Sequence, residues 1–122
     1  MNIPFYKYDG AGNDFILIDN RAGDISLSAE QIAHLCHRRM GVGADGLILL
    51  NATHDEYDFA MRYYNSDGLP ADMCGNGGRC IAAFAHQLGL GTTAYLHRFV
   101  SRNYQCSQRN PREQLWFVRE CI

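Results

Sequence analysis

The segment from Asp72 to Leu88, DMCGNGGRCIAAFAHQL, constrains the fold of this chain more than any other segment. Apolar residues recur at helical spacing after its glycines, which predicts a helix that is buried along one face and ended by Gly89. Cys74 is then at the N-terminal end of that helix. The free backbone N–H groups of residues 75–77, with the positive end of the helix dipole, favour a thiolate or a bound carboxylate there. The pattern therefore indicates a reactive cysteine.

The chain has 122 residues, which is enough for one hydrophobic core, so we expect one domain. A net charge of −2 with 47% hydrophobic residues is typical of a globular protein and provides no basic surface for nucleic acid or a membrane. The first residues lack a basic segment followed by an apolar core, and no apolar run has the length of a membrane span. We therefore expect a cytoplasmic protein whose partners are small molecules or further copies of itself.

The chain contains five cysteines, an odd number without CxxC spacing, which argues against a disulfide framework and a zinc ribbon. His34, Cys36 and His37 are close in sequence and suggest a metal site. On a helix, however, side chains at positions i, i+2 and i+3 do not all point the same way. We expect free thiols, no metal and no bound cofactor, with Cys80 in the core.

Hydrophobic patterns predict a mixture of strands and helices. The turn-forming residues DGAGND join two short strands as a hairpin, and Ser28 with Gln31 forms a capping-box pattern for a helix that ends by Gly41. Because no regular repeat of strand, helix and strand is visible, we expect an α+β domain. Its curved, mostly antiparallel mixed sheet would wrap around a central helix, the one after Cys74. The predicted strands cover residues 5–8, 15–19, 47–50 and 57–64.

Residues 41–46, GVGADG, match the G-x-G-x-x-G spacing of dinucleotide-binding loops. That fingerprint requires a strand before it and a helix after it, whereas here a predicted helix precedes and a predicted strand follows. We therefore expect no nucleotide at this segment. The glycines are better explained by a tight connection from helix to strand or by the close approach of a ligand.

Composition changes sharply near Tyr95. Residues 1–95 hold all 12 glycines and carry a net charge of −5, whereas residues 96–122 hold no glycine and carry +3. We interpret residues 1–95 as the domain and residues 96–122 as a divergent tail. The tail is either a surface extension that adds strands, notably over residues 115–119, or the product of a frameshift.

Asn13 in GAGNDF and Asn65 in YYNSDG are candidate ligand-binding residues, as is Asn76 beside Cys74. Asn13 and Asn65 are explained equally well as turn residues. All three amides can bind the ammonium or carboxylate groups of an amino acid. The available bases for a cysteine nucleophile have no evident orienting group, and each is explained as a structural or solvent-facing residue. These bases are His34, His37 and His86.

Four motifs occur in the order GAGNDF, RRMGVGADGLIL, YNSDG and MCGNGGRC. Together they resemble the N-terminal half of diaminopimelate epimerase over residues 5 to about 91. The resemblance implies an enzyme that interconverts LL- and meso-diaminopimelate in lysine and cell-wall precursor biosynthesis. It also implies that the reaction needs no pyridoxal phosphate, because two cysteines on opposite faces of the α-carbon move the proton.

The resemblance assigns a role to each candidate residue. It implies that Cys74 is one of the two acid/base thiols. Gly75 and Asn76 would donate N–H groups to the reacting carboxylate, which stabilises the developing carbanion. Asn13 and Asn65 would hold the distal amino acid end of the substrate.

The second cysteine of the family lies in a second glycine-rich turn, which these residues lack. Cys106 in QCSQ and Cys121 in ECI have no glycine beside them and no following helix, so neither is a replacement. The resemblance ends at about Leu96, where the composition changes. We therefore expect a truncated half with little activity alone. Three alternatives stay open: a homodimer that brings two Cys74 sites together, a non-catalytic amino-acid-binding half-domain, and a hydrolase that pairs Cys74 with a histidine.

Overall fold

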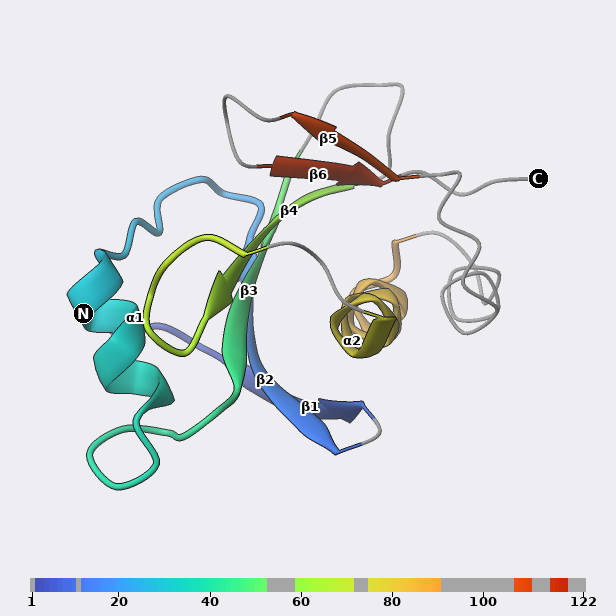
Figure 1. Cartoon of the computed structure of the whole chain (residues 1–122). Helices are drawn as coiled ribbons and strands as arrows, with labels where there is room; N and C mark the ends of the chain where they lie inside the picture. Colours follow the sequence, from blue (N-terminus) through green and yellow to red (C-terminus); the bar gives the residue numbers. More distant parts are fainter. Residues whose placement is uncertain are drawn as a thin grey trace.

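The computed structural model describes residues 2–10, 12–52, 59–71, 75–90, 107–110 and 115–118. In this part of the chain, a six-stranded mixed sheet lies between two helices, one on each face (Figure 1). The predicted α+β class is therefore confirmed. The elements are β1 (Tyr6–Gly10), β2 (Asn13–Asn20), α1 (Ala29–Cys36), β3 (Gly46–Asn51), β4 (Phe59–Asn65), α2 (Gly75–Gln87), β5 (Ser107–Asn110) and β6 (Leu115–Val118).

The strands have the spatial order β1-β2-β3-β4-β6-β5. Only β2 and β3 run parallel, and the other four pairings are antiparallel, so the expected mostly antiparallel mixed sheet is confirmed. Strand β6 falls within the stretch predicted as a strand in the tail. Because β2 and β3 are parallel, the chain between them must cross over, and this crossover contains α1.

The hairpin of β1 and β2 is tighter than the sequence predicts. Gly10 already pairs with Asn13, and Asp9 pairs with Asp14, so the expected six-residue loop is wrong. A two-residue hairpin connection lets the ladder extend almost to the turn, even through residues that are poor strand formers. Asn13 is consequently the first residue of a strand and not a loop residue.

Two hydrophobic cores lie on opposite faces of the sheet, because successive strand side chains alternate between the faces. Alternate residues of β2 show the pattern: Phe15 and Leu17 belong to the core beneath α2, whereas Ile16 and Ile18 belong to the core beneath α1. Burying each such side chain contributes roughly 1.5–3 kcal/mol, so a register slip of one residue would be strongly disfavoured.

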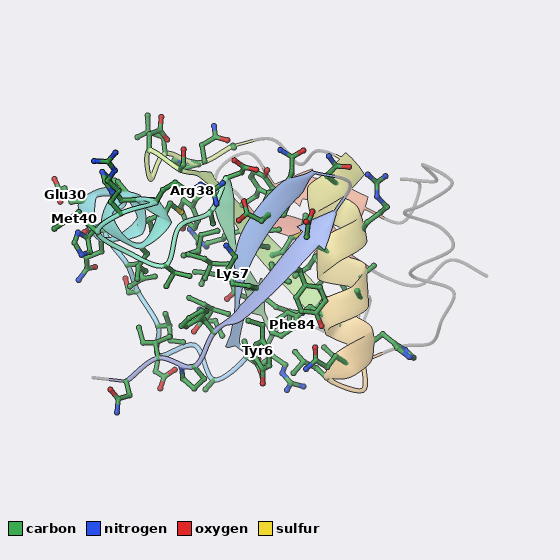
Figure 2. The ribbon with its side chains drawn as sticks, turned by 90° about the horizontal axis from the view of Figure 1, so that it is seen from below. Tyr6, Lys7, Glu30, Arg38, Met40 and Phe84 are labelled. Atoms are coloured by element: carbon green, nitrogen blue, oxygen red, sulfur yellow. The ribbon has the colours of Figure 1, made fainter. Side chains whose placement is uncertain are left out.

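Helix α2 has the apolar face that the sequence predicts. Cys80, Ile81 and Phe84 are buried, and the ring of Phe84 packs on that of Tyr6 with a centroid distance of 5.1 Å (Figure 2). The helix ends at Gln87 and is capped, as predicted, by Gly89, which has φ +81°: Gly89 N donates to His86 O and Leu90 N donates to Ala85 O. Helix α2 packs on β1, β2 and β3 from one side, and a sheet that wraps around it stays a prediction.

Helix α1 begins at the predicted capping box. The Ser28 side chain accepts from Gln31 N, and the Gln31 side chain accepts from Ser28 N. The helix ends at Cys36, and β3 begins at Gly46, so a helix does precede and a strand does follow the GVGADG segment. In the described part of the chain, neither helix has the length and hydrophobicity needed to span a bilayer.

Candidate functional site

Three of the sequence motifs meet at one end of the sheet. Strand β2 begins at Asn13, β3 begins at Gly46 and β4 ends at Asn65, and the register pairs Phe15 with Gly46 and Gly46 with Asn65. Strand alternation puts Asn13 on the same face as Phe15, and Asn65 on the same face as Tyr63. Both asparagines therefore lie on the face that α2 covers, and glycine is the intervening residue on β3.

Asn13 connects this end of the sheet to the first turn of α2. Its Oδ1 accepts a hydrogen bond from Asn76 Nδ2, which joins the GAGNDF and CGNG motifs across 63 positions of the chain. Its Nδ2 donates to Asp45 Oδ2 at 3.1 Å. The three side chains form one hydrogen-bonded chain, in which Asn13 is the central member.

An ion-pair network, consisting of Lys7, Asp14, Arg38 and Asp45, lies beside Asn13. The carboxylate of Asp14 accepts two hydrogen bonds from the guanidinium of Arg38, at 2.7 and 2.8 Å, and one from Lys7 Nζ at 2.7 Å. Arg38 Nη2 also donates to Asp45 Oδ1 at 3.1 Å. Figure 2 labels Lys7 and Arg38, the two cations of the network. The charges of its four side chains cancel.

The network changes the ionisation of its members. Hydrogen bonds from Arg38 hold the pKa of Asp14 well below its usual range. Desolvation of the carboxyl raises this pKa, but the hydrogen bonds from Lys7 and the Asp45 backbone, with the charge of Lys7, lower it further. The same pairing with Asp14 raises the pKa of Arg38. Asp14 is therefore a carboxylate throughout the physiological range, and it holds the Arg38 guanidinium beside Asp45.

None of the four members of this network was predicted from the sequence as a site residue. One signal was available: Lys7 pairs with Ile16 and Asp14 lies two residues before Ile16, so Lys7 and Asp14 are diagonal neighbours across the hairpin. The prediction put Asp14 in the loop and not in the ladder, so it did not indicate this relation. Arg38 is 24 positions from Asp14 in the chain, and no local pattern indicates their contact.

The predicted site residues fall into three groups. The structure brings Asn13 and Asn76 into contact and puts Asn65, which is exposed, at the same end of the sheet. Gly75 is the first residue of α2, as expected for a donor at the helix N-terminus. Cys74 lies outside the described residues, and its role stays a prediction.

The three candidate histidines do not lie beside the start of α2. His34 in α1 and His37 after it are exposed on the other side of the sheet. His86 is exposed near the C-terminal end of α2, about 16 Å along the helix from Gly75. The described residues therefore offer no histidine beside the helix N-terminus. No group of three potential metal ligands occurs among them either.

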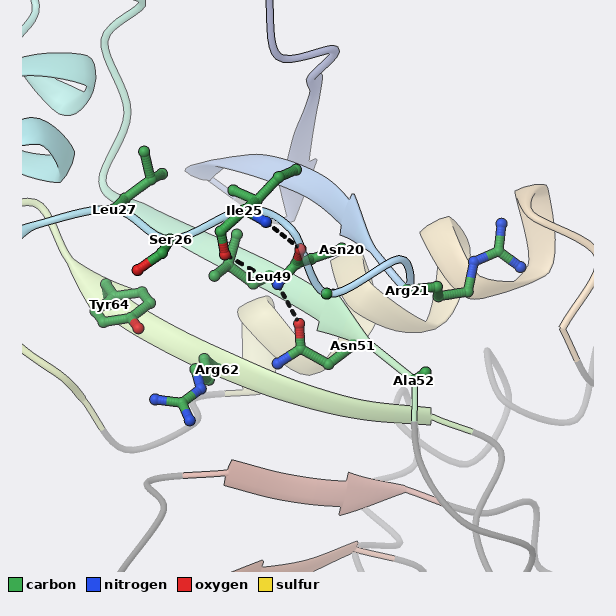
Figure 3. A pocket seen from close by; sticks show the side chains of 11 residues that line it. Asn20, Arg21, Ile25, Ser26, Leu27, Leu49, Asn51, Ala52, Arg62 and Tyr64 are labelled. Carbon is green, nitrogen blue, oxygen red and sulfur yellow. Dashed lines mark hydrogen bonds between the residues drawn. The ribbon is translucent and has the colours of Figure 1, made fainter. Parts of the chain in front are cut away.

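Hollows also open on the described surface. One of about 410 Å³ lies on the α1 face, where Arg62 and Tyr64 of β4 line it and Asn20 Nδ2 donates to Asn51 Oδ1 at 2.8 Å (Figure 3). Asn20 is at the end of β2 opposite Asn13, so this hollow is not part of the predicted site. A more open hollow of about 780 Å³ borders the ion-pair network and includes Arg38 and Asp45.

Comparisons with known proteins agree with the motifs. A family profile described as diaminopimelate epimerase matches residues 5–103. The chain is 57% identical to the diaminopimelate epimerase of Chlorobaculum tepidum over 90 residues, which are 74% of this chain and 35% of that protein. It is 55% identical to the diaminopimelate epimerase of Flavobacterium psychrophilum over 92 residues, which are 72% of this chain and 34% of that protein. The chain thus spans about a third of the length of the curated relatives it matches.

Proposed function

Because the chain belongs to the diaminopimelate epimerase family, we propose that it forms the half of an epimerase active site that carries Cys74. The proposed substrate is diaminopimelate, interconverted between its LL and meso forms for lysine and cell-wall precursor synthesis in the cytoplasm. The observation that carries the proposal is the hydrogen bond between Asn13 and Asn76, which joins two of the family motifs at the N-terminus of α2. A small zwitterionic ligand suits this cluster of amides.

In the proposed reaction, the thiolate of Cys74 removes the α-proton of the substrate from one face. The C–H bond breaks, an S–H bond forms, and the electron pair is delocalised into the adjacent carboxylate. Backbone N–H groups of Gly75 and Asn76, at the positive end of the α2 dipole, stabilise the charge that develops there. A second acid then delivers a proton to the opposite face, which inverts the centre without a bound cofactor.

Substrate orientation is proposed to depend on Asn13 and Asn65. Their amides would bind the distal amino acid group, while the N-terminus of α2 receives the reacting carboxylate. This division of roles is supported by the location of both asparagines on the α2 face, at the same end of the sheet as the start of that helix.

A polypeptide of these 122 residues supplies one thiol of the proposed pair, because only Cys74 lies in a glycine-rich turn. We therefore propose that it inverts little substrate by itself. The second thiol would come from a further polypeptide segment or from Cys74 of a second copy in a homodimer. We also propose that the epimerase-like domain ends near Tyr95, because residues 1–95 carry a net negative charge and residues 96–122 a net positive one.

Proton exchange in D₂O tests the proposed chemistry. With one thiol, the chain is expected to exchange the α-proton of one stereocentre with retention and to produce almost no inverted product. Cys74→Ser should abolish the exchange, and NMR of each epimer measures both outcomes. Inversion at an enzymatic rate by a monomer would contradict the one-thiol proposal, and an equal rate in Cys74→Ser would contradict the role of Cys74.

A non-catalytic amino-acid-binding half-domain is the second candidate function. It is favoured by the contact of Asn13 and Asn76, which needs no second thiol. Titration calorimetry with meso-diaminopimelate, carried out beside the exchange measurement, separates the two. Binding without exchange supports the binding module, whereas binding with exchange that depends on Cys74 supports the epimerase half-site.

A further inference from the structure

We propose that Asp45 is a positioning residue, which holds the amide of Asn13 in the one orientation that can receive the distal end of the substrate. This inference rests on the proposed function, because it concerns the same ligand. Asp45 belongs to none of the residues that the motifs assign to substrate. It is placed beside Asn13 by the connection from α1 to β3, 32 positions along the chain.

The orientation of the Asn13 amide follows from the chemistry of its two partners. An ionised carboxylate only accepts hydrogen bonds, so the Asn13 amide must turn its NH₂ group toward Asp45. Asn13 Nδ2 accordingly donates to Asp45 Oδ2 at 3.1 Å. Asn76 donates from its own Nδ2 to the Oδ1 of Asn13. Rotating the Asn13 amide by half a turn would bring oxygen against the carboxylate and lose both hydrogen bonds. Asp45 therefore prevents the flip that an isolated asparagine makes freely.

The remaining hydrogen-bonding capacity of Asn13 matches an amino acid. A primary amide has two donor hydrogens and two acceptor lone pairs, and the contacts with Asp45 and Asn76 use one of each. One N–H and one lone pair are left for a ligand. They suit a group that carries both a carboxylate and an ammonium, as the distal end of diaminopimelate does, because the carboxylate can accept from the N–H and the ammonium can donate to the lone pair.

Asp45 is itself held in place, which a positioning role requires. Its Oδ1 accepts from Arg38 Nη2 at 3.1 Å, and its Oδ2 accepts from Asp14 N at 3.2 Å. Arg38 is in turn fixed by two hydrogen bonds to the carboxylate of Asp14. The side chain of Asp45 is 41% exposed, so its position depends on these contacts and not on burial.

Two substitutions of Asp45 test the proposal. Asp45→Ala removes the acceptor and should weaken the binding of meso-diaminopimelate about tenfold, the effect of losing one hydrogen bond to a charged group. Asp45→Asn keeps the shape and can still accept from Asn13, but it can also present its own NH₂ group, so its affinity should be intermediate. Asp19→Asn is the matched control, because Asp19 forms an ion pair with Arg21 at 2.8 Å away from Asn13.

A second measurement needs no ligand. The side-chain NH₂ signals of Asn13, identified by their loss in Asn13→Ala, should shift in both Asp45 variants and stay unchanged in Asp19→Asn. Thermal unfolding shows whether each variant is folded. If Asp45→Ala does not fold, Asp45→Asn provides the test. A purely structural role would lower the unfolding temperature without the graded loss of affinity.

The possible results separate this inference from the proposed function. If Asn13→Ala loses affinity and the folded Asp45 variants bind as the unchanged chain does, the positioning role is wrong. If Asn13→Ala also binds normally, the proposed ligand role of Asn13 is wrong, and with it the positioning role. Unshifted Asn13 signals in both Asp45 variants would show that Asp45 does not contact Asn13 in solution, and would overturn the inference.

Discussion

Gly10 lies so close to the first turn of α2 that a β-carbon at residue 10 would be 2.8 Å from the backbone oxygen of Asn76 and 3.0 Å from Cys80 Sγ. No real β-carbon approaches a backbone oxygen so closely. The absence of a side chain at Gly10 therefore allows the hairpin and the helix to meet, and it is what keeps Asn76 within reach of Asn13.

Gly10→Ala should displace the start of α2. We expect a loss of about 1–3 kcal/mol in the free energy of unfolding, the usual cost of overpacking, together with weaker binding of meso-diaminopimelate. Chemical denaturation and calorimetry measure the two effects. Gly23→Ala is the control: its φ of +78° makes alanine strained, but its β-carbon would have no atom within 4 Å, so stability should fall without a change in affinity. Normal affinity in Gly10→Ala would contradict the proposed contact.

The hydrogen bond between Asn13 and Asn76 should appear as a coupling energy. Each single substitution to alanine is expected to destabilise the fold, and the double variant should be less destabilised than the sum by about 0.5–1.5 kcal/mol. Urea denaturation of the four proteins measures this cycle. Strict additivity would mean that the bond contributes nothing in solution.

Asp14 should make stability depend on pH in the acidic range. Since its folded-state pKa is lowered by Arg38 and Lys7, its contribution is fully present above the unfolded value of about 3.9 and is lost as pH falls through the folded value. Asp14→Asn should lower the unfolding free energy by at most about 1 kcal/mol at pH 7, because the pair is partly exposed. Denaturation of both proteins from pH 7 to pH 2 should show the difference shrinking below pH 4, and a difference that stays constant down to pH 2 would contradict the role of the Asp14 carboxylate.

Cys74 should be alkylated before Cys36 and Cys80. Burial raises the pKa of the Cys36 thiol, and Cys80 is only 3% exposed, so neither is a good nucleophile at neutral pH. Iodoacetamide labelling followed by peptide mass spectrometry should show Cys74 reacting at least about tenfold faster than these two, as a thiolate favoured by a helix N-terminus would. Comparable rates for Cys74 and Cys36 would contradict a reactive Cys74.

Ser28→Ala should affect stability alone. It removes the side chain that accepts from Gln31 N at 3.1 Å, and loss of such a cap costs about 1 kcal/mol. Thermal unfolding measures the loss, for which Ser26→Ala, an exposed position before the helix, is the matched control. Ligand affinity should not change, because α1 lies on the opposite face of the sheet from Asn76.

Local features of the fold were predictable from the sequence because each depends on residues within a few positions. The capping box at Ser28 and the C-terminal cap at Gly89 are confirmed, whereas α2 begins at Gly75, earlier than its apolar pattern predicts. The hairpin turn was predicted at the right place but with the wrong length, since Asp9 and Asp14 pair in the ladder although both are common turn residues.

The family motifs were visible in the sequence, and they identified Asn13, Asn65 and Asn76 as candidates before their positions were known. Composition and periodicity could not identify Asp45 or Arg38, because a charged residue in a glycine-rich connection is ordinarily explained by solvent exposure. The contact of Asp45 with Asn13, and that of Arg38 with Asp45, depends on how the connection from α1 to β3 returns to the start of β2.

The sequence by itself determined the local structure, the family and the residue types that can bind an amino acid, because hydrophobic period, turn chemistry and motifs act over short distances along the chain. Only the tertiary structure decided which of those residues meet. The contacts of Asn13 with Asn76 and with Asp45 span 63 and 32 positions, and they exist because parallel pairing of β2 with β3 and packing of α2 on the sheet bring strand ends and a helix N-terminus together. Strand order and register are set by burial over the whole domain, which no local pattern specifies.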